Sequence, residues 1–202
     1  MDKFQNKYRI SSARLQNWDY GWNASYFITI CTHNRQCFFG KIIDEKMELS
    51  EIGETVKHEW LKTFEMRPDM NLTSGEYIIM PNHFHAIITI GKNQYNTPNY
   101  FQNNGPGIRR DAMHCDSTVH THITNTNECK IKNGFRPQSK NLASIIRGFK
   151  TGVTRSARII DPSFTWQSRY YDHIIRDEKS YNNITKYIIN NPLNWKKDND
   201  YV

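Results

Sequence analysis

The sequence predicts an α+β protein: a ferredoxin-like, or split βαβ, antiparallel sheet with helices on one face and a further helix at the C-terminal end. Two observations predict this class. Four β-rich segments and three segments of helical periodicity follow one another in the order β-α-β-β-α-β-α. The chain of 202 residues is also long enough for one domain that has a hydrophobic core and carries a large insertion. We therefore expect a single domain over residues 1–202.

A strand and a helix begin this domain, after a polar and aromatic arm at 8–24. The segment "SYFITICTHN" (25–34) is rich in β-forming residues and predicts the first strand. Ser50 is a suitable N-cap for a helix over 51–67, and Pro68 ends it. Apolar residues recur at helical spacing in this helix and predict its packed face: Ile52, Val56, Trp60, Leu61 and Phe64.

Two more strands and an insertion follow. The strands are expected at "GEYIIM" (75–80) and "HFHAIITI" (83–90), joined by a short turn at Pro81-Asn82. Residues 92–139 have a different composition, rich in Asn and Thr and poor in aliphatic side chains. A segment of this kind has little apolar surface to bury, so we expect a long insertion that is partly disordered.

The last third of the chain supplies a helix over 140–158, a strand over 166–176 and a final helix over 177–192. Asp177 is the expected N-cap of the final helix, and Pro192 ends it. One face of the first of these helices is apolar: Leu142, Ile145, Ile146, Phe149, Val153 and Ala157.

The charge of the chain is compatible with a nucleic-acid partner but does not require one. The net charge is +7, and aromatic residues make up 13% of the chain, which provides rings for base stacking as well as for packing. The helix over 140–158 contains basic residues and no acidic one, which favours a face that tracks phosphates over the alternative of a merely solvated helix face. We predict DNA contacts from this helix and from the N-terminal arm: Arg147, Lys150, Arg155, Arg158 and Arg14.

Several features predict a cytoplasmic protein without a membrane anchor. No apolar run approaches the roughly 20 residues that span a bilayer. The first ten residues, "MDKFQNKYRI", include no apolar signal segment. The four cysteines show no CxxC spacing, and we expect them to be reduced thiols.

Two histidines, His83 and His85, interrupt the apolar strand over 83–90. Residues i and i+2 of a strand point to the same face, so both imidazoles should project together while Phe84 points into the core. We expect the helices over 51–67 and 140–158 to cover the face opposite the histidines. Paired imidazoles suit a divalent metal ion with open coordination positions. The alternative is a pair of histidines that satisfy hydrogen bonds at a strand end, and this short motif does not decide between them.

The final helix offers two polar residues that could reach the same face. Tyr187 and Asn191 are four residues apart, which stacks them on one side of a helix. They flank an apolar stripe of Tyr181, Ile184 and Ile188. A phenol and an amide at this position can both contact a neighbouring sheet. An amphipathic boundary tyrosine and an ordinary helix-end asparagine are the alternatives.

Taken together, these segments resemble a known family. "YIIMPNHFHAIITI" resembles the H-U-H motif of the single-tyrosine HUH transposases of the insertion sequence 200-like family. "WQSRYYDHIIRDEKSYNNITKYIINNPLNW" resembles the tyrosine-bearing region of the REP-associated tyrosine transposases. The resemblance covers residues 8–91 and 138–196. It implies that His83 and His85 bind metal and that Tyr187 is the nucleophile. It also implies a metal-ligand role for the position where many relatives have Gln and this chain has the shorter Asn191.

The resemblance implies a DNA transposase-like nuclease and strand transferase that cleaves and rejoins single-stranded, hairpin-containing DNA. A tyrosine oxygen would displace the 3′-oxygen of a DNA phosphate, leaving a 5′-phosphotyrosine link. Because an unperturbed phenol has a pKa of about 10, a metal ion would help by neutralising developing charge. Mixed nitrogen and oxygen ligands favour Mg²⁺ or Mn²⁺. The resemblance leaves open whether the protein is a monomer or a homodimer.

The sequence also offers alternative functions and alternative site residues. A non-catalytic module that binds single-stranded nucleic acid could use the same sheet, and a relaxase or replication initiator could use the same HUH chemistry. Tyr170, Tyr171 and Tyr181 compete with Tyr187 as nucleophile. A second H-x-H sequence, His120-Thr121-His122, has no finger or ribbon spacing, and a solvated loop is the favoured explanation.

Overall fold

The computed structural model describes residues 3–4, 7–8, 15, 18–97 and 139–197. Three features of the sequence prediction lie outside the described residues: Arg14, the pair His120 and His122, and nearly all of the insertion expected at 92–139.

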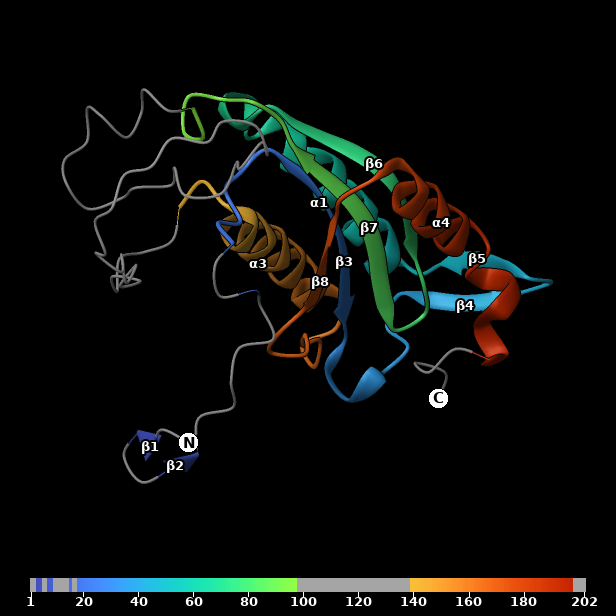
Figure 1. The fold of residues 1–202 in the computed structure, drawn as a ribbon. Coiled ribbons are helices and arrows are strands. Elements are labelled where there is room, and N and C mark those ends of the chain that lie inside the picture. Colours follow the sequence, from blue (N-terminus) through green and yellow to red (C-terminus); the bar gives the residue numbers. More distant parts are fainter. Residues whose placement is uncertain (1–2, 5–6, 9–14, 16–17, 98–138, 198–202) are drawn as a thin grey trace, which may run out of the picture.

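A four-stranded antiparallel sheet forms the centre of the fold, with the spatial order β6-β7-β3-β8 (Figure 1). The predicted α+β class is confirmed. The two central strands pair along their whole length, from Ala24 opposite Ile90 to Cys31 opposite His83. The predicted position of the two histidines on a central strand is therefore also confirmed. The strands are β3 (Ala24–Cys31), β6 (Leu72–Ile79), β7 (His83–Ile90) and β8 (Tyr171–Ile175).

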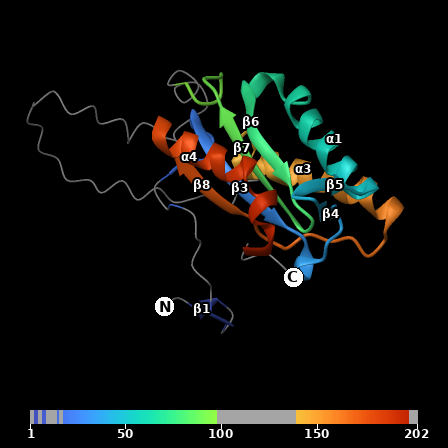
Figure 2. The same cartoon turned by 90° about the vertical axis from the view of Figure 1, so that its right-hand side faces the viewer.

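Helices cover both faces of this sheet. α1 (Glu51–Glu65) and α3 (Leu142–Ile160) pack side by side on one face, whereas α4 (Glu178–Ile189) crosses the other face (Figures 1 and 2). The side of the sheet that carries α4 is the side where the candidate site lies. Within the described part of the chain, no helix is both long and apolar enough to cross a membrane.

Aromatic residues fill the space between the sheet and the α1–α3 pair. The ring centroids of Trp60 and Phe84 are 5.0 Å apart, and each lies within 5.5 Å of Phe149. The apolar face predicted for α3 is buried throughout. Leu61 of α1 departs from the prediction, since 46% of it is exposed. It directly follows the buried Trp60, and adjacent helical positions point in different directions.

The helix ends follow the expected capping rules. Ser50 accepts a hydrogen bond from the Gly53 amide at 3.1 Å, and Asp177 accepts one from the Ser180 amide at 2.7 Å. Both N-caps were predicted. α3 begins two residues later than expected because Asn141 is its N-cap and accepts from the backbone amide of Ser144.

A β-hairpin between β3 and α1 escaped the sequence prediction. It consists of β4 (Gly40–Ile43) and β5 (Lys46–Leu49). Its turn residues Asp44 and Glu45 both have positive φ, 46° and 63°. A two-residue turn with two positive φ angles normally contains Asn-Gly or Asp-Gly, so Asp-Glu provides no comparable signal.

The remaining differences concern short elements. The last strand is shorter than the predicted range 166–176, because Trp166 makes only an isolated bridge to Thr32 before the regular pairing begins at Tyr171. The other short elements are β1 (Lys3–Phe4), β2 (Lys7–Tyr8), η1 (His33–Arg35), η2 (Pro68–Met70) and η3 (Pro192–Lys197).

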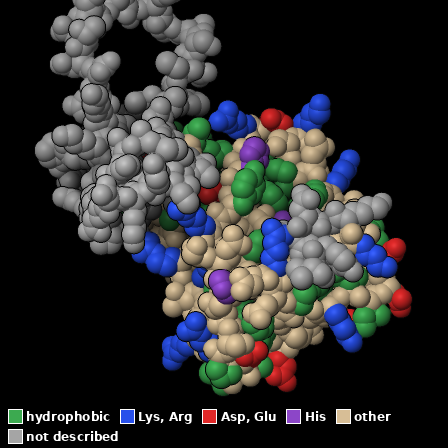
Figure 3. All heavy atoms as spheres, turned by 90° about the horizontal axis from the view of Figure 1, so that it is seen from below, with side chains coloured by type: hydrophobic (Ala, Val, Ile, Leu, Met, Phe, Trp, Pro, Cys, Tyr) green, Lys and Arg blue, Asp and Glu red, His purple; other side chains and the backbone are tan. Residues whose placement is uncertain are grey.

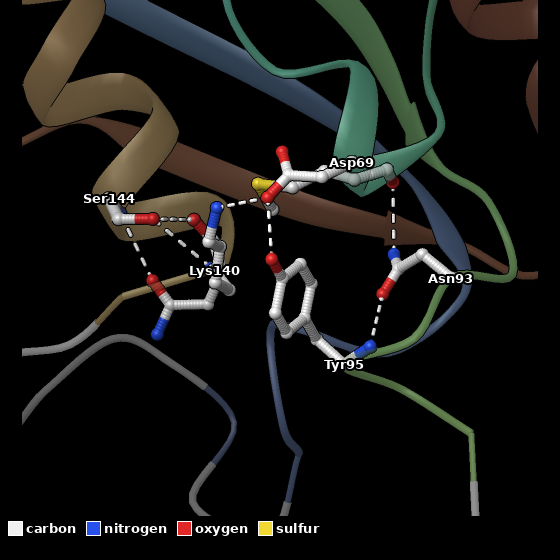
Figure 4. Close-up of polar contacts among 7 residues, drawn as sticks. Asp69, Asn93, Tyr95, Lys140 and Ser144 are labelled. Carbon is white, nitrogen blue, oxygen red and sulfur yellow. Dashed lines mark hydrogen bonds and ion pairs between the residues drawn. The ribbon is translucent and has the colours of Figure 1, made fainter. Parts of the chain in front are cut away.

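The two described ends of the insertion meet at the η2 turn (Figure 4). On the entry side, the Tyr95 hydroxyl donates to the Asp69 carboxylate at 2.6 Å, and the Asn93 amide donates to the carbonyl of Met70 at 2.9 Å. On the exit side, the Lys140 ammonium pairs with the same carboxylate. The hydrogen bond from Lys140 is the main reason why the pKa of Asp69 is lowered. One carboxylate therefore holds both ends of the 98–138 segment.

Candidate active site

The two histidines of β7 lie side by side on the face of the sheet that carries α4. Their ring centroids are 4.4 Å apart and both side chains are buried. Phe84, between them in sequence, packs on the other face against Trp60 and Phe149. The prediction that both imidazoles share one face, opposite α1 and α3, is confirmed.

Asn82 fixes the orientation of the His83 ring. The Asn82 side-chain oxygen lies 2.9 Å from Nδ1 of His83, while its amide nitrogen donates to the carbonyl of Arg35 at 3.0 Å. The second bond identifies the oxygen side of the amide, and an amide oxygen can only accept. His83 Nδ1 therefore donates, so the lone pair of the neutral ring is on Nε2.

His85 is held between a strand residue and the last helix. Its Nδ1 lies 2.8 Å from the hydroxyl of Thr29, and its Nε2 lies 3.3 Å from the phenol oxygen of Tyr187. The ring of Phe27 stacks on the imidazole at 5.4 Å. Burial, and then the neighbouring His83, lower the pKa of His85 well below its usual value. The ring is consequently neutral at neutral pH and can act as an acceptor or a metal ligand.

Tyr187 reaches the histidines from α4, as the sequence predicted. Its ring lies 5.3 Å from that of His85 and meets Phe27 edge-on at 6.1 Å. About half of the side chain, 48%, is exposed to solvent. The phenol is therefore both in contact with an imidazole and accessible to a large substrate.

Asn191 is buried beyond the end of the helix, not stacked on Tyr187 within it. α4 ends at Ile189, before the predicted end at 192, because Pro192 disfavours helical geometry at the residue before it. The Asn191 side-chain oxygen has no hydrogen-bond partner among the described residues. The ring of Trp195, four residues later, contacts that of His83 at 5.9 Å. The segment 187–195 thus contacts both histidines, with Asn191 at its middle.

These side chains fit a divalent metal ion by the chemistry of their donor atoms. His83 presents an Nε2 lone pair, and Asn191 presents a buried amide oxygen that a cation would satisfy. Among the described residues, no group of three or more His, Cys, Asp or Glu side chains could hold a metal ion. The buried Asn191 oxygen is therefore the candidate for a third protein ligand beside the two imidazoles.

The three tyrosines that compete with Tyr187 differ in exposure and in position. Tyr171 is 58% exposed and projects from β8 on the face of the histidines, opposite Thr29 in the strand register. Its ring lies 6.4 Å from Phe27. Tyr170 packs against the main core, and Tyr181 packs against the smaller cluster under α4. Tyr171 is thus the exposed phenol that competes most directly with Tyr187.

The basic residues predicted for DNA lie away from the histidines. All four described ones belong to α3, on the opposite face of the sheet (Figure 2). Lys150 donates to the carbonyl of Gln167 at 2.6 Å, and burial lowers its pKa to about 8. Arg158 donates to the carbonyl of Phe164 at 3.0 Å. Arg147 and Arg155 are exposed. Viewed from below, Lys and Arg side chains are spread around the described surface without forming one patch (Figure 3).

Sequence reasoning missed the residues that support the site. Phe27, Thr29 and Trp195 contact the histidines or Tyr187, but their positions depend on strand register and on the chain after α4. Asn82 directly precedes His83 in "MPNHFH", and its place in the turn before the strand was a usable signal.

Comparison of the sequence with known proteins identifies a relative. No family model matches the sequence. An uncharacterized protein of Haemophilus influenzae (strain ATCC 51907 / DSM 11121 / KW20 / Rd) is 37% identical over 192 residues, which cover 95% of this chain and 92% of that protein. The chain belongs to the family of this Haemophilus influenzae protein.

The fold is also found in a solved structure. A REP-associated tyrosine transposase bound to a REP hairpin superposes with a TM-score of 0.52 and 17% identity, covering 91% of this chain and 73% of that one. The antiparallel sheet with its helices is therefore an architecture that a DNA transposase also uses.

Proposed function

We propose that this protein is a transposase-like nuclease and strand transferase that cleaves and rejoins single-stranded DNA through a phosphotyrosine at Tyr187. The observation that carries the proposal is the contact between the half-exposed Tyr187 phenol and His85, beside a second buried imidazole. The shared fold with a transposase supports the reaction class. The resemblance of the two sequence motifs supports the assignment of the individual residues.

The proposed reaction exchanges one phosphate ester for another. The phenol oxygen of Tyr187 attacks the phosphorus, its bond to phosphorus forms, and the bond from phosphorus to the 3′-oxygen breaks. The phenol proton ends on the released 3′-oxygen, so atoms and charge balance. The number of phosphate ester bonds is unchanged, so the step needs no ATP and can run backwards to join a new end.

His83, His85 and Asn191 would hold the divalent ion, Mg²⁺ or Mn²⁺, that the donor set favours. Such an ion, when bound, polarises the phosphate and offsets its developing charge. Asn82 and Thr29 hold the two imidazoles through their Nδ1 atoms. In the tautomer that can ligate a metal ion, Nε2 of His85 carries the one lone pair of the ring, and this lone pair cannot accept a hydrogen from Tyr187 and ligate the ion simultaneously.

The proposed substrate is single-stranded DNA that contains a hairpin. The solved transposase of the same fold is described as bound to a REP hairpin, and the net charge of +7 on this chain suits a polyanion. Exposed arginines such as Arg147 and Arg155 are candidates for phosphates distant from the reacting one.

A cleavage assay tests the proposal. The protein is incubated with end-labelled single strands taken from the DNA that flanks its own gene, in Mg²⁺, in Mn²⁺ or in chelator. We expect a shortened strand and a covalent protein–DNA adduct that survives denaturation, in the presence of metal ion only. Tight DNA binding without an adduct, across both ions and several hairpins, would favour a non-catalytic binding module instead.

A further inference from the structure

We propose that the groove between β8 and the first half of α4 holds an unpaired DNA base next to the phosphate that Tyr187 attacks. The inference rests on the proposed function and adds a subsite to it. The groove has a volume of about 490 Å³, within the range of small-molecule sites. Its lining includes Phe27, Tyr171, His173, Ser180, Asn183 and Ile184.

The groove is continuous with the candidate active site through Phe27. This ring meets those of Tyr187 and Tyr171 at steep angles, with centroid distances of 6.1 Å and 6.4 Å, and it stacks on the imidazole of His85. Ile184 lies one helical turn before Tyr187 on the same side of α4. A ligand in the groove would therefore be an immediate neighbour of a strand bound at Tyr187.

Two side chains of β8 form the wall on which a base could stack. Tyr171 and His173 alternate along the strand, so both project on the α4 side, where they are exposed. Tyr171 leaves 58% of its surface in solvent, which is unusual for a residue whose only task is packing. Exposed aromatic rings on a sheet are the usual stacking platforms for unpaired bases, and stacking tolerates any base.

The polar lining suits a nucleotide better than an apolar peptide. The Ser180 hydroxyl and the Asn183 amide offer donors and acceptors for a base edge. Lys179 supplies a positive charge for a phosphate. Asp177 is an acid at the same groove, but its carboxylate already caps α4 by accepting from the Ser180 amide. The groove therefore combines exposed rings, neutral hydrogen-bonding groups, one basic side chain and one carboxylate that caps α4.

Photocrosslinking tests the proposal directly. Single-stranded oligonucleotides carrying one 5-iodouracil at successive positions are bound to Tyr187→Phe protein, irradiated and digested with trypsin. Arg169 and Arg176 flank the peptide that contains Tyr171 and His173. We expect crosslinks on this peptide from one or two adjacent positions of the strand. Tyr171→Ala should remove these crosslinks and weaken binding roughly tenfold, as expected for one stacked base.

Matched variants complete the experiment. Tyr171→Phe keeps the ring and should retain binding. His173→Ala removes the second exposed ring of the same wall. His58→Ala and Leu61→Ala alter exposed residues of α1, on the opposite face, and should change nothing.

The remaining outcomes separate the subsite from the reaction. Strands that bind but crosslink elsewhere would overturn the subsite and leave the proposed function intact. Failure to bind any single strand would overturn both. If Tyr171→Ala left DNA binding unchanged but altered the sedimentation of the protein, the groove would be a contact between copies of the chain.

Discussion

The phenol oxygen of Tyr187 lies 3.3 Å from Nε2 of His85, although 102 residues separate them in the chain. The contact joins the last helix to a central strand and places the candidate nucleophile against the candidate metal ligand. When Nδ1 of His85 carries the ring proton, the phenol and a metal ion compete for the one lone pair of Nε2. This competition can be measured without any DNA.

Removal of the Tyr187 hydroxyl should not weaken metal binding. In Tyr187→Phe, Nε2 of His85 loses its hydrogen-bond partner on α4, and the imidazole that would ligate the ion stays in place. We expect the variant to bind Mn²⁺ at least as tightly as the parent in calorimetric titration, while His83→Ala combined with His85→Ala abolishes binding. Markedly weaker binding by Tyr187→Phe would mean that the phenol itself belongs to the metal site.

Asn82 should act as a positioning residue for His83. Asn82→Ala removes both the acceptor of His83 Nδ1 and the donor to the Arg35 carbonyl. We expect a decrease of about 1–3 kcal/mol in the free energy of unfolding, because buried groups are left without their partners. Mn²⁺ affinity should fall by about 10–100-fold, as for other residues that orient metal ligands. Asn190→Ala, at an exposed position directly after α4, is the control. Unchanged Mn²⁺ affinity in Asn82→Ala would contradict the orienting role.

The basic residues of α3 should fall into two groups by their effect on DNA binding. Charge reversal of Arg147 and Arg155, both exposed, should weaken binding to single-stranded DNA and reduce the salt slope by about 0.7 for each phosphate that is no longer neutralised. Lys150→Met should change that slope little, because the Lys150 ammonium is directed at the Gln167 carbonyl and at the ring of Trp166. Titrations of affinity against salt measure both effects. An unaltered slope after both charge reversals would show that this face is only solvated.

The insertion should be replaceable if its anchor is kept. A short Gly/Ser linker in place of residues 98–138 retains Asp69, Tyr95 and Lys140, whose contacts join the two ends (Figure 4). We expect cooperative thermal unfolding close to that of the parent. A linker that replaces all of 92–139 removes Asn93 and Tyr95 and should be less stable. Loss of cooperative unfolding in the shorter replacement would show that the core extends into 98–138.

Local periodicity predicted much of the fold and, within the candidate site, the shared orientation of the two histidines. The period of two along a strand places His83 and His85 on one face, and the helical stripe of α3 is buried as expected. The contact of Thr29 with His85 depends on the pairing of β3 with β7, which periodicity does not reveal. The burial of Lys150 depends on the chain around Trp166. Residues whose contacts depend on strand register, or on the packing of irregular segments, therefore could not be predicted from the sequence.

Mass spectrometry of the covalent adduct tests the central claim most directly. After cleavage of a hairpin-containing strand by the parent protein, trypsin separates the competing tyrosines, because Tyr187 is the only tyrosine in the peptide 187–196. Tyr170 and Tyr171 lie in the peptide 170–176, and Tyr181 lies in the peptide 180–186. We predict that the nucleotide mass is attached to the 187–196 peptide and that Tyr187→Phe forms no adduct. Attachment to the 170–176 peptide would contradict the account and move the nucleophile to Tyr170 or Tyr171.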